Sequence, residues 1–170
     1  MEWIHYYESP LGKIMLASDG EALNGLWFTG QKYFAATLEE THEEKKLAVF
    51  DLADTWLDTY FSGKAPDFMP PLAMKATPFR RAVWEIMLTI PFGQTMAYQE
   101  IADRIAKQRG ISSMSAHAVG GAVAHNPISL MIPCHRVVGS NGSLTGYAGG
   151  LDKKEWLLAM ERRGQEDQFI

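Results

Sequence analysis

The sequence predicts an α+β protein with a mixed α/β N-terminal domain, residues 1–75, and a mainly helical C-terminal domain, residues 76–170. In the first third of the chain, short aliphatic and aromatic runs alternate with turn residues, as in a meander of strands. Beyond a proline-rich segment, apolar residues recur three and four positions apart, which is typical of helices that bury one face. The length of 170 residues fits one compact body or two small subdomains that share a core.

The N-terminal domain is predicted to begin with hairpins. Pro10-Leu11-Gly12 and Asp19-Gly20 separate its apolar runs, as tight turns between antiparallel strands require. The predicted strands are Trp3–Tyr7, Lys13–Ser18 and Leu23–Phe28. A helix is expected over residues 47–61, and Gly63 ends it. Its apolar positions are Leu47, Phe50, Ala53, Leu57 and Phe61.

The C-terminal domain follows a linker over residues 64–75, whose three prolines cannot continue a helix. Thr77 and Pro78 predict a helix start, with threonine as N-cap and proline in the first turn. The further predicted helices cover residues 98–108, a stretch from Ser113 or Ser115 to about His125, and about Asp152 to Arg163. Two short helices after a longer one resemble a helix-turn-helix, a pattern that many small helical domains share.

Charge is distributed unevenly along the chain. The formal net charge of −4 argues, taken as a whole, against a nucleic-acid binder. Residues 1–75 hold 6 basic and 12 acidic residues, whereas residues 76–164 hold 10 basic and 6 acidic ones. The basic excess of the second part indicates a polyanionic partner for that half. Solvated surface charge without a partner explains the same counts equally well.

No targeting or membrane segment is predicted. The first residues lack a basic region followed by an apolar run, and every apolar stretch ends before the ~18 residues of a membrane span. We therefore expect a soluble cytoplasmic protein without membrane contact. The single cysteine excludes an internal disulfide and any cysteine-cluster zinc site. His5 and His42 alone do not form a site, so neither a metal nor a cofactor is expected.

The single cysteine, Cys134, is the candidate nucleophile, because a thiolate reacts well when a base or positive charge promotes it. His135 and Arg136 follow it directly. Adjacent side chains on an extended segment point apart, so a bridging water is one way for His135 to reach the sulfur. The alternative is a buried cysteine that only packs as a small hydrophobic residue. Pro133 favours the reactive interpretation, since it fixes the backbone before Cys134.

The predicted helix that ends near His125 contains two adjacent glycines, Gly120 and Gly121. Each costs a helix about 1 kcal/mol relative to alanine, so the small surface must serve a close approach. Close packing against a second helix is one explanation. The functional alternative is a helix laid against a nucleic-acid backbone, where large side chains do not fit.

The run Ile132-Pro133-Cys134-His135-Arg136-Val137-Val138 resembles the active-site sequence of the O6-alkylguanine-DNA alkyltransferases, also called methylated-DNA–protein-cysteine methyltransferases. Ordered matches cover residues 76–163, about half of the chain, and residues 1–75 fit the variable N-terminal domain only loosely. Further matches are Pro91-Phe92-Gly93, Tyr98, Ala118-Val119-Gly120-Gly121, Asn126-Pro127, Tyr147-Ala148-Gly149-Gly150 and Lys154-Glu155-Trp156-Leu157-Leu158. The resemblance implies an RNase H-like N-terminal domain and a winged helix-turn-helix C-terminal domain.

The resemblance also implies a reaction. Cys134 would take the alkyl group from O6 of guanine by direct displacement, in one irreversible turnover that consumes the protein. His135, held by Glu161, would take the thiol proton through a water. Tyr98 would donate a proton or hydrogen bond to the guanine ring as negative charge builds there. Asn126 would brace the joint between the recognition helix and the active-site segment.

Binding residues carry over in the same way. The partner would be double-stranded DNA containing O6-alkylguanine, and the damaged nucleotide must leave the stack before its O6 is reachable. The carbonyls of Cys134 and Val137 would accept from the exocyclic amine, while Tyr147 and the Ala148 N–H would hold the ring and the O6 side. A monomer is expected. The residues implied to contact DNA are His117, Ala118, Gly120, Gly121 and Arg136.

One position departs from the family pattern, and two rival functions stay open. His117 stands where the family usually has an arginine that fills the gap left by the flipped base, so we expect weaker DNA binding. One rival is a DNA-binding module without activity, although relatives of that kind lack the cysteine that is present here. The other is a cysteine hydrolase that uses Cys134 and His135 in turnover, which would also need an oxyanion hole.

Overall fold

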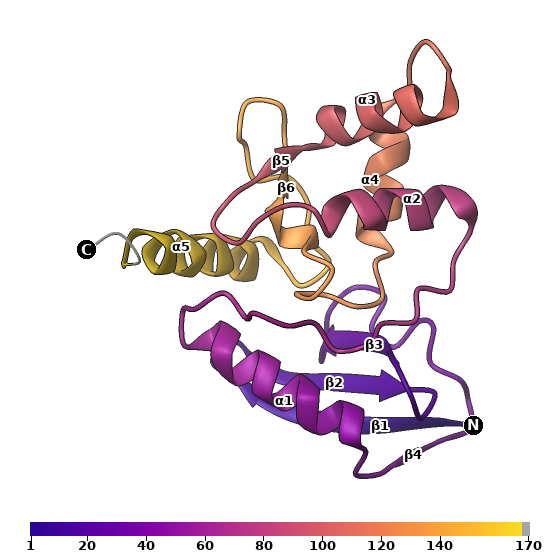
Figure 1. Cartoon of the computed structure of the whole chain (residues 1–170), viewed down its shortest axis with the longest axis vertical. Helices are drawn as coiled ribbons and strands as arrows, with labels where there is room; N and C mark the ends of the chain where they lie inside the picture. The colour runs from indigo at the N-terminus through magenta and orange to yellow at the C-terminus, as the bar shows by residue number, and fades with distance from the viewer. Residues whose placement is uncertain (168–170) are drawn as a thin grey trace.

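The computed structural model describes residues 1–167 and divides them between a sheet-containing N-terminal part and a helical C-terminal part (Figure 1). The N-terminal elements are β1 (Glu2–Ser9), β2 (Gly12–Ser18), β3 (Leu23–Phe28), β4 (His42–Glu44) and α1 (Ala48–Phe61). The C-terminal elements are α2 (Pro78–Met87), β5 (Met96–Ala97), α3 (Tyr98–Arg109), α4 (Ala116–Ala124), the 3-10 helix η1 (Cys134–Arg136), β6 (Val137–Val138) and α5 (Leu151–Asp167). Within residues 1–167, no helix is long and apolar enough to cross a membrane.

The N-terminal sheet has the strand order β3-β2-β1-β4, and α1 lies along one of its faces (Figure 1). The three predicted strands are present, and β1 and β2 pair antiparallel from Trp3 opposite Ser18 to Ser9 opposite Gly12. The short strand β4 was not predicted. Its three residues are all exposed, so no apolar pattern marks it, and only the parallel pairing with β1 defines it.

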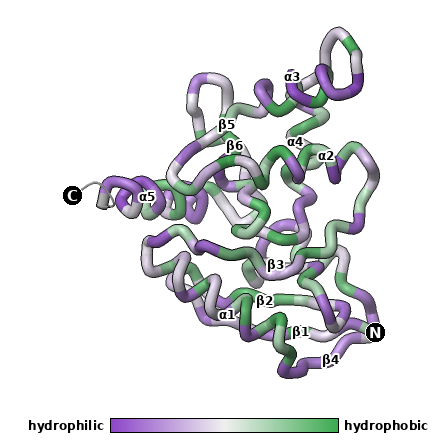
Figure 2. Tube along the Cα trace, in the orientation of Figure 1, coloured by the Kyte–Doolittle hydropathy of each residue, from purple (hydrophilic) through white to green (hydrophobic). Residues whose placement is uncertain are grey.

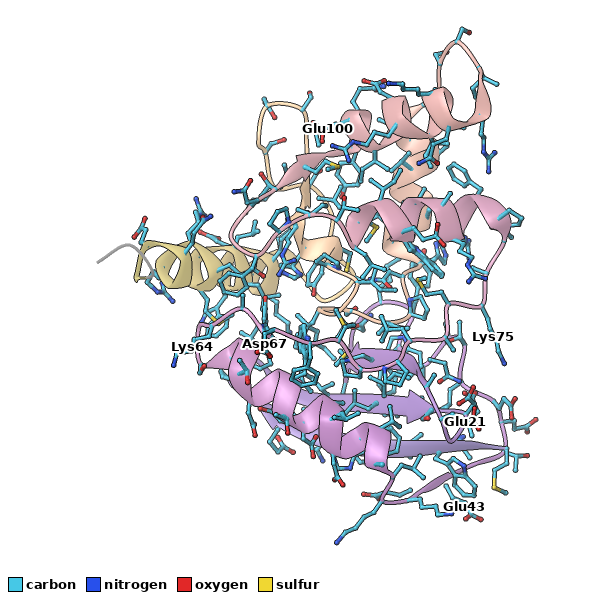
Figure 3. The ribbon with its side chains drawn as sticks, in the orientation of Figure 1. Glu21, Glu43, Lys64, Asp67, Lys75 and Glu100 are labelled. Atoms are coloured by element: carbon cyan, nitrogen blue, oxygen red, sulfur yellow. The ribbon has the colours of Figure 1, made fainter. Side chains whose placement is uncertain are left out.

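The helix α1 begins and ends within one residue of its prediction, and it buries its apolar side against the sheet. Phe50, Leu57 and Tyr60 are buried on that side, in one core cluster with Leu16 and Leu26 of the sheet. Charged side chains lie on the outside of this part, and Figure 3 labels Glu21 and Glu43 at the edge of the sheet, within the acidic half of the sequence. The sequence therefore placed both the helix and its buried face correctly.

In the C-terminal part, the helix ends follow the capping residues of the sequence. The Thr77 side chain accepts from the Arg80 N–H at 3.3 Å, and the Ser115 side chain accepts from the Ala118 N–H at 3.0 Å. Gly110 ends α3 in the left-handed conformation, with φ of 67°. Figure 2 shows hydrophobic residues along α4 and hydrophilic ones along the outer turns of α3. The helices α2, α3 and α4 pack together as the predicted helix-turn-helix.

One apolar core runs through both parts. It includes Leu26 of β3, Leu57 of α1, Trp84 of α2 and Leu157 of α5. The backbone also crosses between the parts, because the Leu26 N–H donates to the Pro127 carbonyl at 2.8 Å and the Ser129 N–H donates to the Leu26 carbonyl at 3.0 Å. The segment after α4 therefore lies against β3, and the residues that follow it are held by both parts of the chain.

Candidate functional site

Cys134 lies at the first position of the 3-10 helix η1, which follows α4 in the chain and leads directly into β6 of the two-stranded sheet. The expected extended segment was wrong here, because the Arg136 N–H turns back to the Pro133 carbonyl at 3.0 Å. The thiol is 5% exposed and lines a cavity of about 410 Å³. Burial raises the pKa of Cys134, and the side chains of Asn126 and Ser129 with the charge of Lys154 oppose that shift only in part. At neutral pH the resting thiol is therefore protonated.

Asn126 connects the end of α4 to the Cys134 segment. Its Nδ2 donates to the Ile132 carbonyl at 2.8 Å, and its Oδ1 accepts from the Ile128 N–H at 3.0 Å. Within that turn, Leu130 has a φ of 71°, a conformation that side chains other than glycine rarely adopt. The two hydrogen bonds from one buried amide hold a strained turn, and this turn fixes where Cys134 begins.

Behind Cys134, the carboxylate of Glu161 on α5 collects hydrogen bonds from four residues. His135 Nε2 lies 2.5 Å from Oε2, and Arg136 Nε donates to Oε1 at 2.8 Å. The Gly93 N–H donates to Oε1 at 3.0 Å, and the Tyr60 hydroxyl donates to Oε2 at 2.5 Å. Both His135 and Glu161 are fully buried. The carboxylate is thus ionised and surrounded by donors, as a buried charge requires.

The protonation states in this cluster follow from the contacts. Burial alone would raise the pKa of the Glu161 carboxyl, but His135 and Arg136 hold it well below its usual range. Burial lowers the pKa of His135, and Glu161 opposes this shift only in part, so the imidazole is neutral. A neutral imidazole has one N–H, and here it lies on Nε2, where it donates to the ionised Glu161. Among the described residues Nδ1 has no hydrogen-bond partner, so it is the nitrogen with a free lone pair.

The cavity at Cys134 has walls from both parts of the chain. Tyr98 on α3, Tyr147 and Ala148 in the loop after β6, and Lys32 and Tyr33 after β3 line it. Tyr98 donates its hydroxyl to the Thr145 carbonyl at 3.1 Å. The Tyr147 hydroxyl is buried, and no described residue bonds it. The cavity is therefore aromatic on its sides, with the thiol in its wall.

Lys154 on α5 fixes the loop that carries Tyr147. Its Nζ donates to the carbonyls of Val137 at 2.6 Å, Thr145 at 3.1 Å and Gly146 at 3.1 Å. Burial lowers the pKa of Lys154 to about 8. The Val137 carbonyl, which the resemblance assigns to the exocyclic amine of guanine, accepts from this ammonium and has its second lone pair left for such a contact.

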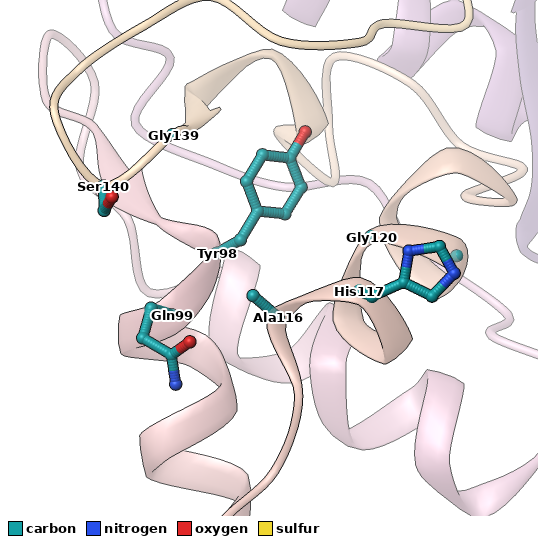
Figure 4. Close-up of a pocket in the computed structure, with 8 residues that line it drawn as sticks. Tyr98, Gln99, Ala116, His117, Gly120, Gly139 and Ser140 are labelled. Atoms are coloured by element: carbon teal, nitrogen blue, oxygen red, sulfur yellow. The ribbon is translucent and has the colours of Figure 1, made fainter.

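A second cavity of about 480 Å³ opens on the outer face of α4, and Tyr98 and Gly120 line both cavities. Figure 4 shows Tyr98 beside the Gly139–Ser140 segment, with Ala116 and His117 on the first turn of α4. Among residues 1–167, a Cβ built on Gly120 or Gly121 would have no neighbour within 4 Å. The explanation by close helix packing is therefore wrong. The glycines leave open a shallow face that His117 borders.

Models of one protein family match the chain in two consecutive parts. Residues 78–163 match the DNA binding domain of 6-O-methylguanine DNA methyltransferase, and residues 3–74 match its ribonuclease-like domain. The chain belongs to this family. The predicted resemblance is therefore confirmed, and so is the fold class of a ribonuclease-like domain followed by a helical DNA-binding domain.

Individual members of the methyltransferase family match over nearly their whole length. The methylated-DNA–protein-cysteine methyltransferase of Methanosarcina barkeri is 45% identical over 154 residues, 91% of this chain and 93% of the relative. The protein of that name from Mycobacterium bovis is 40% identical over 161 residues, 94% and 93% of the two chains. Among solved structures, Mycobacterium tuberculosis OGT in complex with DNA superposes with a TM-score of 0.81 at 37% identity, covering 95% of this chain and 94% of OGT.

Within this methyltransferase fold, the structure brings most of the predicted site residues together. Cys134, His135, Asn126 and Glu161 lie in or directly behind one cavity wall, and Tyr98, Tyr147 and Ala148 line the cavity. His117, Ala118 and Gly121 are exposed on α4.

Arg136 is the exception. We expected it to contact DNA, but its guanidinium is buried, donates to Glu161 and also donates to the Ile90 carbonyl at 2.8 Å. Because a buried carboxylate needs a cation, Arg136 is used inside the molecule and not at the DNA surface.

Three contributors to the site were missed in the sequence. Tyr60, Lys32 and Tyr33 belong to the N-terminal part, for which the resemblance supplied no site residues. Tyr60 lies on the apolar face of α1, and a buried tyrosine hydroxyl normally needs a hydrogen-bond partner. That signal predicts a polar group nearby. The sequence does not reveal that the group is the Glu161 carboxylate, more than a hundred residues away.

Proposed function

We propose that this chain repairs duplex DNA by moving the alkyl group from O6 of a flipped-out guanine to Cys134, once per molecule. Membership of the family confirms the predicted activity, transfer from methylated DNA to a protein cysteine. The assignment of Cys134 as acceptor rests on one observation. The single cysteine of the chain lies in the wall of the aromatic cavity, directly before the histidine that Glu161 orients.

Because the pKa of Cys134 is raised, the resting thiol is protonated and must lose its proton in the course of the reaction. His135 Nδ1 would take the thiol proton through a water, and the resulting imidazolium would be stabilised by Glu161. The thiolate attacks the alkyl carbon, a sulfur–carbon bond forms, and the bond from carbon to O6 breaks. The electron pair stays on the guanine, which takes up a proton. The thioether has no easy leaving path, so the protein is consumed.

Tyr98 and the loop after β6 would hold the guanine. The Tyr98 hydroxyl, which donates to the Thr145 carbonyl, would turn its hydrogen toward the ring nitrogen as negative charge builds there. Tyr147 would pack on the ring and the Ala148 N–H would bind the O6 side. The carbonyls of Cys134 and Val137 would accept from the exocyclic amine, with Val137 using the lone pair that Lys154 leaves free.

The outer face of α4 would lie against the DNA. His117 and Ala118 are exposed there, and the surface at Gly120 and Gly121 is open, which allows a backbone to approach closely. His117 would occupy the gap that the flipped nucleotide leaves. The flipped base would then pass from this face to Cys134, since Tyr98 and Gly120 line both cavities.

Intact mass tests this proposal. Incubation with a duplex containing O6-methylguanine should add one methyl group per molecule, at Cys134, and nothing to Cys134→Ala. Product release beyond one equivalent would show a hydrolase, and DNA binding without a gain in mass would show a binding module. Light scattering of the free protein and of its DNA complex should give one copy of the chain.

A further inference from the structure

The N-terminal domain contributes a side chain to the buried cluster behind Cys134. Tyr60 on α1 is fully buried, and its hydroxyl donates to Glu161 Oε2 at 2.5 Å and lies 3.2 Å from His135 Nε2. Its ring is stacked on Trp56 with centroids 5.2 Å apart and meets Phe61 and Phe92 edge to face. Because the ring is packed on these sides, the position of the Tyr60 hydroxyl is fixed.

The short contacts allow one arrangement of protons. Glu161 is ionised, so its Oε2 can only accept, and both Tyr60 and His135 Nε2 must point a hydrogen at it. In the opposite arrangement Tyr60 would donate to His135 Nε2. Two lone pairs would then face each other across the 2.5 Å between Nε2 and Oε2, and the proton of His135 would sit on Nδ1. In that tautomer Nδ1 has no lone pair to take the thiol proton, and the lone pair on Nε2 faces Glu161.

We propose that Tyr60 is a positioning residue for alkyl transfer: its hydroxyl holds the Glu161 carboxylate toward Nε2 of His135 and so keeps Nδ1 as the basic nitrogen. This inference rests on the proposed function, in which His135 takes the proton of Cys134. It gives the N-terminal domain a part in the chemistry and explains why α1 is packed against α5 through polar as well as apolar groups.

The pH dependence of the reaction separates positioning from mere packing. A general base speeds the reaction only where the thiol is still protonated, so its advantage disappears at high pH. Tyr60 itself keeps its proton there, because burial and then Glu161 raise its pKa well above the usual value. The titratable and charged groups that face Cys134 and His135 are Tyr60, Tyr98, Arg136, Tyr147, Lys154 and Glu161.

The experiment compares Tyr60→Phe with the control Tyr7→Phe. The Tyr7 hydroxyl on β1 donates to Asp58 of α1 at 2.6 Å, and Tyr7 does not line the cavity. Single-turnover methyl transfer is measured from pH 7 to pH 10. At pH 7 we expect Tyr60→Phe to be about tenfold slower, a part of the ~10²–10⁴-fold that a general base supplies. As the thiol ionises with rising pH, followed by the ultraviolet absorbance of the thiolate, the rate of Tyr60→Phe should approach that of the unsubstituted protein, while Tyr7→Phe matches it throughout. Lys154 is unchanged in all three proteins, so its titration affects their rates alike and drops out of the ratio of the rates.

A slower rate whose ratio stays constant while the thiol ionises would show a packing role and overturn the inference, as would an unchanged rate at pH 7. If the unsubstituted protein gains no methyl group, the proposed function fails instead. Nitrogen NMR of the His135 ring in the unsubstituted protein gives a second test that needs no folded variant. We expect the proton on Nε2, and a proton on Nδ1 would overturn the inference.

Discussion

The two sides of the Cys134 cavity are built in opposite ways. On the inner side, Glu161 accepts from Tyr60, Gly93, His135 and Arg136, and its side chain is fully buried. On the outer side, α4 presents glycines with open space around them. The inner side depends on buried groups that are packed and hydrogen-bonded. The outer side depends on glycines, whose lack of a side chain leaves the surface of α4 open.

The two sides of the cavity carry different energetic costs. Burying a carboxylate costs desolvation free energy, which hydrogen-bond donors around it must offset. Removing one of the partners of Glu161 should therefore destabilise the inner side. The glycines of α4 cost about 1 kcal/mol each in helix stability, and within residues 1–167 no neighbouring group comes close enough to require so small a side chain. The inner side should therefore lose stability and activity together when it is changed, whereas the outer side should trade one against the other.

The largest expected effect comes from breaking the inner side with Glu161→Gln. Arg136 would lose its buried counter-charge, and removing one partner of a buried pair typically costs about 3–5 kcal/mol. Urea unfolding measures this loss. Methyl transfer should fall as well, because an amide does not hold the His135 proton on Nε2. The control is Glu100→Gln, which breaks an exposed pair with Arg104 on α3 and should cost no more than about 1 kcal/mol. Equal losses for the two variants would contradict the comparison.

Acid should weaken the inner side without any substitution. The Glu161 pKa is lower in the folded than in the unfolded protein, so its stabilisation is present above the unfolded value of about 4.3 and is lost as the pH falls further. The His135 pKa is also lowered by folding, so the unfolded chain binds more protons below about pH 6.5 and stability falls in the same direction. Urea unfolding from pH 7 to pH 3 should show this decline, and Glu161→Gln should flatten its lower part. A free energy of unfolding that is constant over this range would exclude the assignment.

Local signals predicted the parts of the fold that depend on neighbouring residues. The caps Thr77 and Ser115 and the terminal Gly110 set helix ends through bonds to residues three or four positions away. The strand β4 was not predicted, because His42–Glu44 is exposed and pairs only with β1, which is distant in the sequence. Long-range pairing of this kind leaves no periodic pattern to read.

The site divides along the same line. The run around Cys134 and its likeness to a family identified the residues that line or support the cavity, but not what each atom bonds. The family resemblance implied Arg136 at the DNA surface, and in the structure its guanidinium donates to Glu161 instead. The Val137 carbonyl is bound by Lys154, and Tyr60 comes from the other domain. These groups are far apart in the chain and come together only on folding, so the sequence alone does not show which partner each of them binds.

The outer side can be tested by Gly121→Ala, for which we expect opposite signs in two measurements. The added methyl group meets no atom within 4 Å, so the free energy of unfolding should rise by about 0.5–1 kcal/mol through the better helix propensity of alanine. DNA affinity should fall, by roughly threefold to tenfold or about 0.7–1.4 kcal/mol, because the backbone can no longer approach as closely. Urea unfolding and a duplex titration give the two values. Unchanged affinity together with higher stability would mean that this face of α4 does not lie against DNA.

The smallest expected effect is a gain, from His117→Arg on the same face. His117 is exposed, and an arginine there would carry a full charge on a longer side chain. One additional phosphate contact should steepen the dependence of log affinity on log salt by about 0.9 and raise the affinity a few-fold at low salt. The free energy of unfolding should hardly change, since His117 is exposed at the start of α4. Titrations at several salt concentrations measure both quantities. If affinity and salt slope both stay at the value for His117, the side chain at this position does not reach the DNA, and the outer side works through the shape of α4 alone.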